Sequence, residues 1–327
     1  MLTRTDLFRE AAATGFQAEP LEKVIRLLGL LDALRSHPFL KTRIALKGGT
    51  ALNLFASDVP RLSVDIDLNY LGAAKRETMQ ADRPKVEQAV QAVCGRLGIG
   101  IKRSPVHHAG GKWRLSYIAV SGRTGMLELD VNFMFRTPLW PPAKGDSHPI
   151  GSYRATQVPM LDVHELAAGK MAALLARSAG RDLFDVREIL SRKDLDVTKL
   201  RLGFVVYGGI NRKDWRGVSV DDIQADPREI DRTLLSLLRA DLVPPKAQIA
   251  RWTRLLVDDC RDHVSAMLPL APNEREFIGR LNEKGDIVSD LLTGDKAMQT
   301  TLRDHPGLKW KAQNVKQHFG IASDEEE

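Results

Sequence analysis

The sequence predicts an α/β fold in which an N-terminal lobe built on a sheet precedes a mainly helical C-terminal lobe. Two observations support this prediction. In the first part of the chain, short apolar or alternating segments that favour strands are interspersed with helical segments and glycine-rich turns. From Leu161 onward, apolar residues recur mostly at helical spacing. We place the domains at 1–155 and 156–327, with the proline-rich stretch 137–149 as the hinge.

Periodicity and turn residues predict the individual elements. Apolar residues three or four positions apart indicate helices, and alternation indicates strands. In the first lobe we expect, in chain order, a helix at 21–34, a strand at 44–47, a short helix at 51–56, a strand at 63–70, a helix at 75–97, and strands at 99–102, 112–120 and 126–135. In the second lobe we expect helices at 161–177, 182–192, 228–238, 246–257 and 274–284.

The bulk composition is that of a globular protein with excess positive charge. The apolar fraction is 43% and the charged fraction 28%, both near the average for folded domains. A formal net charge of +6 favours a polyanionic partner such as nucleic acid, although many basic proteins bind none. Cys94 and Cys260 are far apart in sequence, and no segment is apolar enough for a signal peptide or a membrane span. We therefore expect a soluble, cytoplasmic protein that does not enter a membrane.

Two predicted strands each carry carboxylates on one face. Because successive side chains of a strand point to opposite sides, Asp65 and Asp67 share one face, while Ile66 points to the core. Asp130 lies on the polar face of a later predicted strand, at 126–135. If the two strands are neighbours, the three carboxylates approach one another, and two such charges ~4 Å apart repel by about 4 kcal/mol at an effective dielectric of ~20. The simplest relief is a bound Mg²⁺ or Mn²⁺. The alternative is that both polar faces simply contact solvent.

A glycine-rich turn lies upstream of these carboxylates. Gly48, Gly49 and Thr50 follow the strand predicted at 44–47 and open a helix. Glycine lets the backbone approach a ligand closely, and a helix N-terminus offers N–H groups and the positive end of a dipole. Either feature alone is common. A phosphate-binding turn and a carboxylate pair together are what a metal-bound nucleotide needs.

The helix predicted at 161–177 carries two cations in its apolar arc, Lys170 and Arg177. A charge in such a position is costly unless it reaches a partner. We expect Lys170 to be unpaired within the protein and to neutralise a triphosphate, with Arg177 or Arg181 contacting phosphate or the acceptor. The alternative is that both cations extend to the edge of the lobe. Asp182 and Asp185 form an i,i+3 pair on the next helix, and Arg181 could instead pair with one of them.

Aromatic residues give no independent sign of function. We interpret Trp252 and Trp310 as packing residues rather than as platforms on which bases stack.

Taken together, these residues resemble a known family. The segments LKGGTALNLF and RLSVDIDL resemble the signature of the AbiEii family, which lies within the polymerase-beta-like nucleotidyltransferase superfamily and has MenT-like members. Downstream, Lys170 matches a helix lysine of the family, and Arg177, Arg181 and Asp182 match its Arg-x(3)-Arg-Asp element. The stretches REFIGRLNEKGDIVSDLLTGD and HPGLKWKAQNV are also similar, so that the resemblance extends over roughly 21–315.

The resemblance implies a nucleotidyltransferase fold with a mixed sheet in the N-terminal lobe, dependence on Mg²⁺ and an NTP, and a role as a toxin. Together with the residue patterns, it predicts catalytic roles for Asp65, Asp67, Lys170 and Asp182, metal binding by Asp65, Asp67 and Asp130, and nucleotide binding by Gly48, Gly49, Thr50, Lys170, Arg177, Arg181 and Asp185.

The predicted function is transfer of NMP from the NTP to RNA, specifically the tRNA 3′ end. Growth inhibition would follow, within a toxin–antitoxin or phage-defence system that includes a cognate antitoxin. Two alternatives stay open. The same fold could modify a hydroxyl of a protein or small molecule, or the chain could be a nucleotide-binding regulator without turnover.

Overall fold

The computed structural model describes residues 2–103 and 110–321, and the chain divides into two compact units. The first unit holds the described residues up to Arg136, together with Pro141–Asp162 and Pro227–Ala250; the second holds Thr137–Trp140, Val163–Asp226 and the described residues from Arg251 onward. Pro227–Ala250 therefore belongs to the first unit although it lies late in the sequence. The compact units are groups of residues in mutual contact and do not show which parts fold independently. The predicted domains 1–155 and 156–327 therefore stay a prediction.

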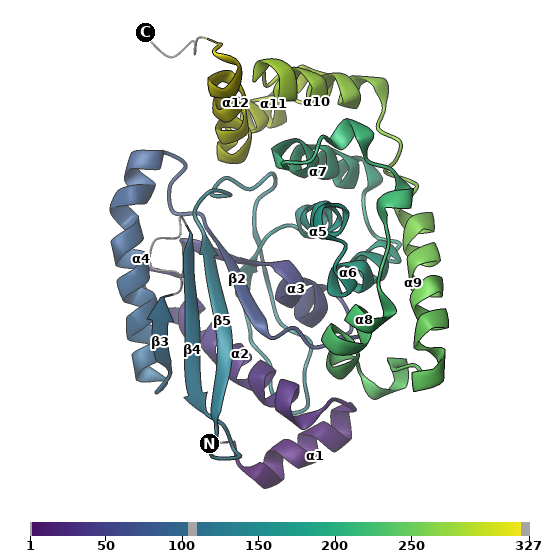
Figure 1. Ribbon diagram of the computed structural model, residues 1–327. Helices are drawn as coiled ribbons and strands as arrows, with labels where there is room; N and C mark the ends of the chain where they lie inside the picture. The colour runs from purple at the N-terminus through teal and green to yellow at the C-terminus, as the bar shows by residue number, and fades with distance from the viewer. Residues whose placement is uncertain (1, 104–109, 322–327) are drawn as a thin grey trace. The chain divides into compact units, whose positions relative to one another are not determined.

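A seven-stranded sheet organises the first unit (Figure 1). Its strands are β1 (Ile44–Lys47), β2 (Asp65–Tyr70), β3 (Gly100–Arg103), β4 (Gly111–Ile118), β5 (Thr124–Asn132), β6 (Ala143–Gly145) and β7 (Val158–Met160), in the order β3-β4-β5-β2-β1-β7-β6. The pairs β2/β5 and β1/β7 are parallel, and the other neighbours are antiparallel. The predicted α/β fold with a mixed sheet is confirmed.

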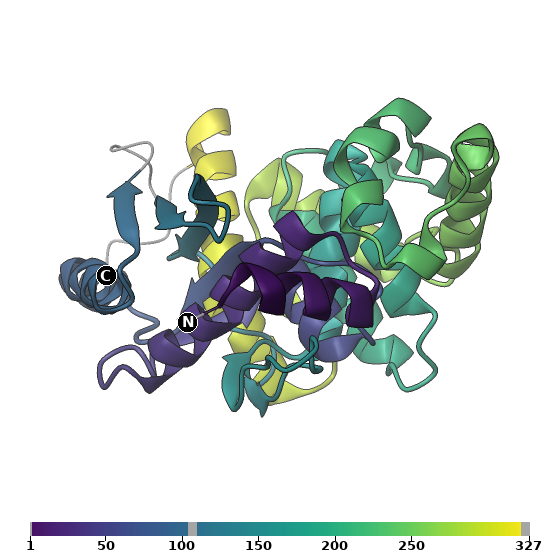
Figure 2. The ribbon, with the colours of Figure 1, turned by 90° about the horizontal axis from the view of Figure 1, so that it is seen from below.

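Helices cover the apolar face of this sheet. The first unit contains α1 (Arg4–Thr14), α2 (Ala18–Ser36), α3 (Gly48–Ala51), a π-helical turn η1 (Leu52–Ala56), α4 (Arg76–Arg96) and α8 (Pro227–Thr233). Helix α2 runs behind the sheet in Figure 1 and contacts β5, β7 and α4. Figure 2 shows α1 beside α2. Leu27 of α2, Ile66 of β2 and Leu129 of β5 are fully buried. Burial of this side leaves the opposite face of β2 and β5 to the polar residues.

The second unit is helical. It contains α5 (Val163–Arg177), α6 (Gly180–Leu190), α7 (Val197–Ile210), most of α9 (Ile249–Val264), α10 (Pro272–Lys284), α11 (Lys296–Asp304) and α12 (Pro306–Phe319). Helix α7 packs against α5, α10 and α12. A Cβ placed on Gly208 would lie 2.3 Å from the Trp215 ring, so only glycine lets these groups approach so closely. Among the described residues, no helix has both the length and the apolar character needed to cross a membrane.

Most predicted elements are present, although α1, α7, α11, α12, β6 and β7 were not predicted and several predicted elements differ in extent. The short helix expected at 51–56 begins three residues earlier, at Gly48, and becomes π-helical from Leu52. The helix expected at 228–238 ends at Thr233, so its predicted extent is wrong. The chain turns there, and the Leu237 carbonyl accepts a hydrogen bond from the Leu62 N–H at 2.8 Å. Helix α7 was not predicted, since its run of valines and glycines has weak local helix preference.

Candidate active site

The turn between β1 and α3 brings the backbone directly against a carboxylate. Gly48 has φ +72°, in the left-handed region that glycine adopts without strain. A Cβ placed on Gly48 would lie directly against Asp67 Oδ2, so any side chain here would displace that carboxylate. Lys47 pairs with Asp67 across β1 and β2, and this register sets the contact. Glycine at position 48 is therefore required both by the backbone angle and by the adjacent carboxylate.

Two side chains hold this turn in place. The Thr50 hydroxyl is fully buried and donates to the Asp65 carbonyl (2.5 Å), and Asn53 Nδ2 donates to the Gly49 carbonyl (2.9 Å). The hydroxyl of Thr50 is thus an anchor for the start of β2, and the group of this residue suited to a phosphate is its backbone N–H. The first N–H groups of a helix have no intrahelical acceptor, so the turn at Gly48 opens a helix with N–H groups of the kind that the predicted phosphate cradle requires. Nucleotide binding by Gly48, Gly49 and Thr50 stays a prediction.

The structure makes the two carboxylate-bearing strands neighbours. Strands β2 and β5 pair in parallel, with Asp67 beside Asp130 and Asp65 beside Glu128. These four residues, the carboxylate face below, are all neither fully buried nor freely exposed. The strand pairing on which the predicted role of Asp130 depended is confirmed. However, among the described residues no three His, Cys, Asp or Glu side chains come close enough together to hold a metal ion. Asp130 as a third metal ligand therefore stays a prediction.

Asp65 and Asp67 alone fit the needs of a magnesium site that is completed by substrate. Mg²⁺ prefers oxygen ligands, keeps several waters, and is bound in nucleotide enzymes by one or two carboxylates together with phosphate oxygens. The pair supplies two such carboxylates on one strand face, and the Gly48 turn supplies a place for phosphate directly beside Asp67. A closed cage of three protein carboxylates is not required for this chemistry.

Cations flank the carboxylates, and the sequence argument missed them. Lys112 of β4 lies opposite Asp130, while Lys47 of β1 lies opposite Asp67, so that cations bracket two carboxylates across four neighbouring strands. Lys112 Nζ is 2.8 Å from Glu128. The hydrogen bond to Glu128, with the charges of Asp130 and Asp65, raises the pKa of Lys112. The alternation in KWRLSYI carries this signal, since it puts Lys112 on the polar face.

A second group of predicted residues comes together in the helical unit, where α5 packs against α6. Lys170 Nζ lies 3.0 Å from Asp182 Oδ1 and 2.9 Å from Asp185 Oδ2. Arg177 forks onto Asp182, with Nε 2.6 Å from Oδ2 and Nη2 3.0 Å from Oδ1. These four residues form the buried ion-pair cluster. Their two cations and two carboxylates balance.

The expectation that Lys170 is unpaired within the protein is wrong. Its side chain is 10% exposed, and its partners Asp182 and Asp185 are 2% and 0% exposed, so the pairing occurs out of water. The carboxylates sit one helical turn apart on α6, where a single ammonium group reaches both. Local periodicity detects the apolar setting of a charge but cannot show a partner on another helix. Binding of a triphosphate by Lys170 stays a prediction. The phosphate would have to compete with Asp182 and Asp185 for the ammonium group.

The Asp182 carboxyl has a lowered pKa despite its burial. Burial raises the pKa of its carboxyl, but the hydrogen bond from Arg177 and the charge of Lys170 outweigh burial and lower it below its ordinary value. Arg177 itself is 64% exposed, so its guanidinium reaches solvent while it holds Asp182. Arg181, at the start of α6, is exposed. Of the predicted cations, Arg177 and Arg181 are thus the two that a ligand in solution can reach.

Comparison with known proteins decides the family. The family model described as the nucleotidyl transferase AbiEii toxin of a type IV toxin–antitoxin system matches residues 29–263, which is well over half of the chain. The chain belongs to the AbiEii family. It is therefore a nucleotidyltransferase of a toxin family, as the resemblance implied. All the predicted site residues, from Gly48 to Asp185, fall within the matched range.

The fold has a solved counterpart. The AbiEii chain is similar to MenT4, a nucleotidyltransferase toxin from Mycobacterium tuberculosis H37Rv, with a TM-score of 0.59 and 18% sequence identity over 94% of this chain and 99% of that chain. At this identity the likeness concerns the fold. A search of curated protein sequences gave no match.

Proposed function

We propose that this AbiEii protein transfers NMP from an NTP to RNA, with the 3′ end of tRNA as acceptor and a divalent cation, Mg²⁺ or Mn²⁺, as cofactor. The observation that carries the proposal is the contact between a glycine turn and a carboxylate pair. Gly48 lies against Asp67, and Asp65 shares the strand face of Asp67. A nucleotide phosphate and its cation would thus have adjoining sites.

The residues of the chain divide the work. Asp65 and Asp67 hold the cation, and the N–H groups of the Gly48 turn bind phosphate oxygens. When bound, such a cation lowers the pKa of an attacking hydroxyl and neutralises charge on the phosphates. Asp182 and Asp185 keep Lys170 oriented until phosphate replaces one of these carboxylates as its partner.

Charge favours RNA as the acceptor. The formal net charge of the chain is +6, and α9 presents Arg251 and Arg254 to solvent three residues apart on one side of the helix. Exposed cations on one helix face suit successive phosphates of a nucleic-acid backbone. A small-molecule or protein acceptor would not require them.

Transfer can be tested directly. The protein is incubated with each α-labelled NTP, Mg²⁺ and either total RNA, total protein or small-molecule extract, and the labelled product is separated by size. Label in a tRNA-sized band that disappears on 3′-end blocking is the expected result. Label in protein or in a small product would contradict RNA as the acceptor and would identify a protein or small-molecule hydroxyl instead. NTP binding without any labelled product would make the chain a regulator.

The path of the RNA can be tested by a salt series. Affinity for tRNA is measured from low to high salt for the wild type, for Arg251→Gln/Arg254→Gln, and for a control, Arg280→Gln/Lys284→Gln on α10. Each phosphate contact adds about one unit to the slope of log affinity against log salt. We expect the α9 variant to be flatter by about one to two units. Equal slopes for both variants would move the RNA away from α9.

The family supports a proposal for the cellular role. A toxin of a type IV toxin–antitoxin system has a cognate antitoxin, and we propose that this one acts in the cytoplasm, where it inhibits growth, including as a phage defence. Cys94 and Cys260 are both free and buried, which suits a reducing compartment. Co-expression of a cognate antitoxin should restore growth to cells that express the wild type.

A further inference from the structure

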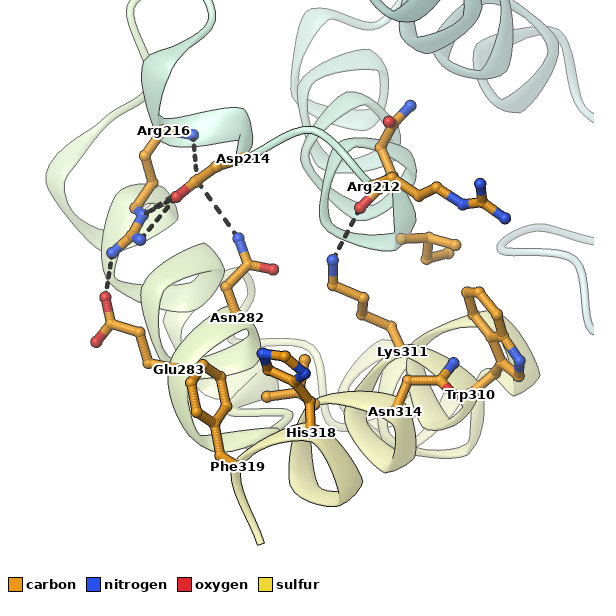
Figure 3. Close-up of a pocket in the computed structure, with 13 residues that line it drawn as sticks. Arg212, Asp214, Arg216, Asn282, Glu283, Trp310, Lys311, Asn314, His318 and Phe319 are labelled. Atoms are coloured by element: carbon orange, nitrogen blue, oxygen red, sulfur yellow. Dashed lines mark hydrogen bonds and ion pairs between the residues drawn. The ribbon is translucent and has the colours of Figure 1, made fainter. Parts of the chain in front are cut away.

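The helical unit contains a pocket of about 900 Å³ that none of the predicted site residues lines (Figure 3). Its walls come from the end of α7, the short turn η2 (Trp215–Gly217), α10 and α12. Small-molecule and cofactor pockets span about 300–1,000 Å³. The pocket is thus large enough for a nucleotide unit.

Helix α12 presents aromatic groups along one wall. Trp310 and His318, eight residues apart, lie on the same helix face, and Phe319 follows directly. Figure 3 shows Trp310 near one end of the pocket and Phe319 near the other. Trp310 is 40% exposed and Phe319 58%. Trp310 is thus partly buried and partly open to the pocket, so its interpretation as a packing residue stays a prediction, whereas Trp252 packs at 6.5 Å against Phe184.

The charges of the pocket leave a cationic excess. Its two carboxylates, Asp214 and Glu283, are both held by Arg216, which lies 2.7 Å from Asp214 Oδ2 and 2.5 Å from Glu283 Oε1. Lys311 Nζ donates to a backbone carbonyl, that of Asn211, at 2.9 Å. Burial lowers the pKa of Lys311, so an anion at this place would be favourable. Within residues 2–103 and 110–321, the exposed Arg212 makes no ion pair.

Amide groups complete the lining. Asn282 Nδ2 donates to Asp214 Oδ1 at 3.3 Å, whereas Asn282 Oδ1 is buried and has no hydrogen-bond partner in the described part of the chain. Asn314 lies exposed on the same face of α12 as Trp310. Amides can both donate to and accept from the edge of a base. Exposed aromatic rings, unpaired amide capacity and surplus positive charge are the features with which proteins bind unstacked nucleotides.

We propose that this pocket binds a single-stranded nucleotide of the acceptor RNA, with its base stacked on Trp310 and its phosphate beside Lys311 and Arg212. The proposal rests on the proposed RNA acceptor and adds a substrate-recognition site in the helical unit. A duplex cannot use the pocket, because its bases are already stacked and paired.

The test uses the full-length protein and a fluorescent single-stranded RNA octamer of mixed sequence. Wild type is compared with Trp310→Ala and with Lys311→Gln, which removes the charge but retains a donor for the Asn211 carbonyl. Phe8→Ala, another exposed aromatic, and Lys309→Gln, an exposed lysine on α12, are the matched controls. Stacking of one base on an aromatic side chain predicts a loss of about tenfold in octamer affinity for Trp310→Ala. The controls should change affinity by less than about twofold.

Further probes separate the sources of nucleotide and the two proposals. An RNA duplex should bind all variants equally, and free NMP should bind weakly. NTP affinity should be the same in every variant, and Trp310→Ala should raise KM for the RNA acceptor with little change in kcat. Unchanged octamer affinity in both pocket variants overturns the pocket proposal, even where wild type transfers NMP to RNA. Free NMP binding as tightly as the octamer also overturns it. Octamer binding that depends on Trp310, without any transfer to RNA, instead contradicts the proposed function.

Discussion

The carboxylate face and the buried ion-pair cluster use the same residue types in opposite ways. On the carboxylate face, β2 and β5 set Asp67 beside Asp130 and Asp65 beside Glu128, and like charges directly opposite each other weaken a sheet. In the buried cluster, Lys170 lies between Asp182 and Asp185, and Arg177 forks onto Asp182. The first arrangement gains from an added cation, whereas the second balances its charges internally. The same kind of substitution should therefore affect chemistry in one region and folding in the other.

The largest expected effect is on the carboxylate face. Asp65→Asn or Asp67→Asn should lower NMP transfer by about a thousandfold or more, because several kcal/mol of charge stabilisation disappear with the cation. Stability should be unchanged or slightly higher, since a repulsion is removed. The measurements are labelled-NTP transfer at saturating Mg²⁺ and urea unfolding. Glu128→Gln, on the same face, is the control and should keep activity within about threefold.

Asp130 sharpens this prediction. A loss for Asp130→Asn as large as that for Asp67→Asn would make it a third ligand, whereas a loss of only a few fold would make it a neighbour. Full turnover by Asp65→Asn/Asp67→Asn with Mg²⁺ present would refute the metal assignment.

The next effect is on folding. Lys170→Met should destabilise the protein by about 3 kcal/mol, because it leaves two carboxylates buried without their shared cation. In urea unfolding, the double variant Lys170→Met/Asp185→Leu should recover much of this loss, since it removes an unbalanced charge together with its partner.

The double variant also separates the two roles of Lys170. A stable protein without transfer would support a phosphate contact. Recovery of activity together with stability would show that Lys170 is structural. Equal unfolding of the wild type and the single variant would contradict the ion-pair argument altogether.

The smallest effect concerns pH. Asp182 has a lowered pKa in the folded protein, so its contribution to stability is complete above its ordinary pKa of 3.8 and is lost as the pH falls through the lower folded value. Arg177→Gln removes a hydrogen bond that lowers this pKa, so the acid loss should begin at higher pH. Because Arg177 is 64% exposed, the cost near neutral pH should be only about 1 kcal/mol.

Unfolding free energies from about pH 7 to about pH 3 test this shift. The control is Arg280→Gln, which removes an exposed pair with Glu276. Acid limbs of the same shape and position in wild type and Arg177→Gln would show that Arg177 does not set the pKa of Asp182.

Local patterns predicted a substantial part of the fold and of the site. The strand at 44–47 was predicted with its observed bounds, and α4 within one residue at each end although Pro84 lies inside that helix. Alternation placed Asp65 and Asp67 on one face without any knowledge of neighbouring strands. Helix α7 escaped prediction because its helicity depends on packing against α5, α10 and α12.

The sequence by itself determined the α/β class, the mixed sheet implied by the family resemblance, the shared face of Asp65 and Asp67, and the family. Tertiary structure alone decided which groups meet. It set Gly48 against Asp67, used the Thr50 hydroxyl as an anchor, and gave Lys170 two partners on α6. The physical reason is that periodicity reports which side of its own helix or strand a residue occupies. Register between strands and packing between helices bring together residues that are far apart in the chain. No local pattern shows which of these distant residues become neighbours.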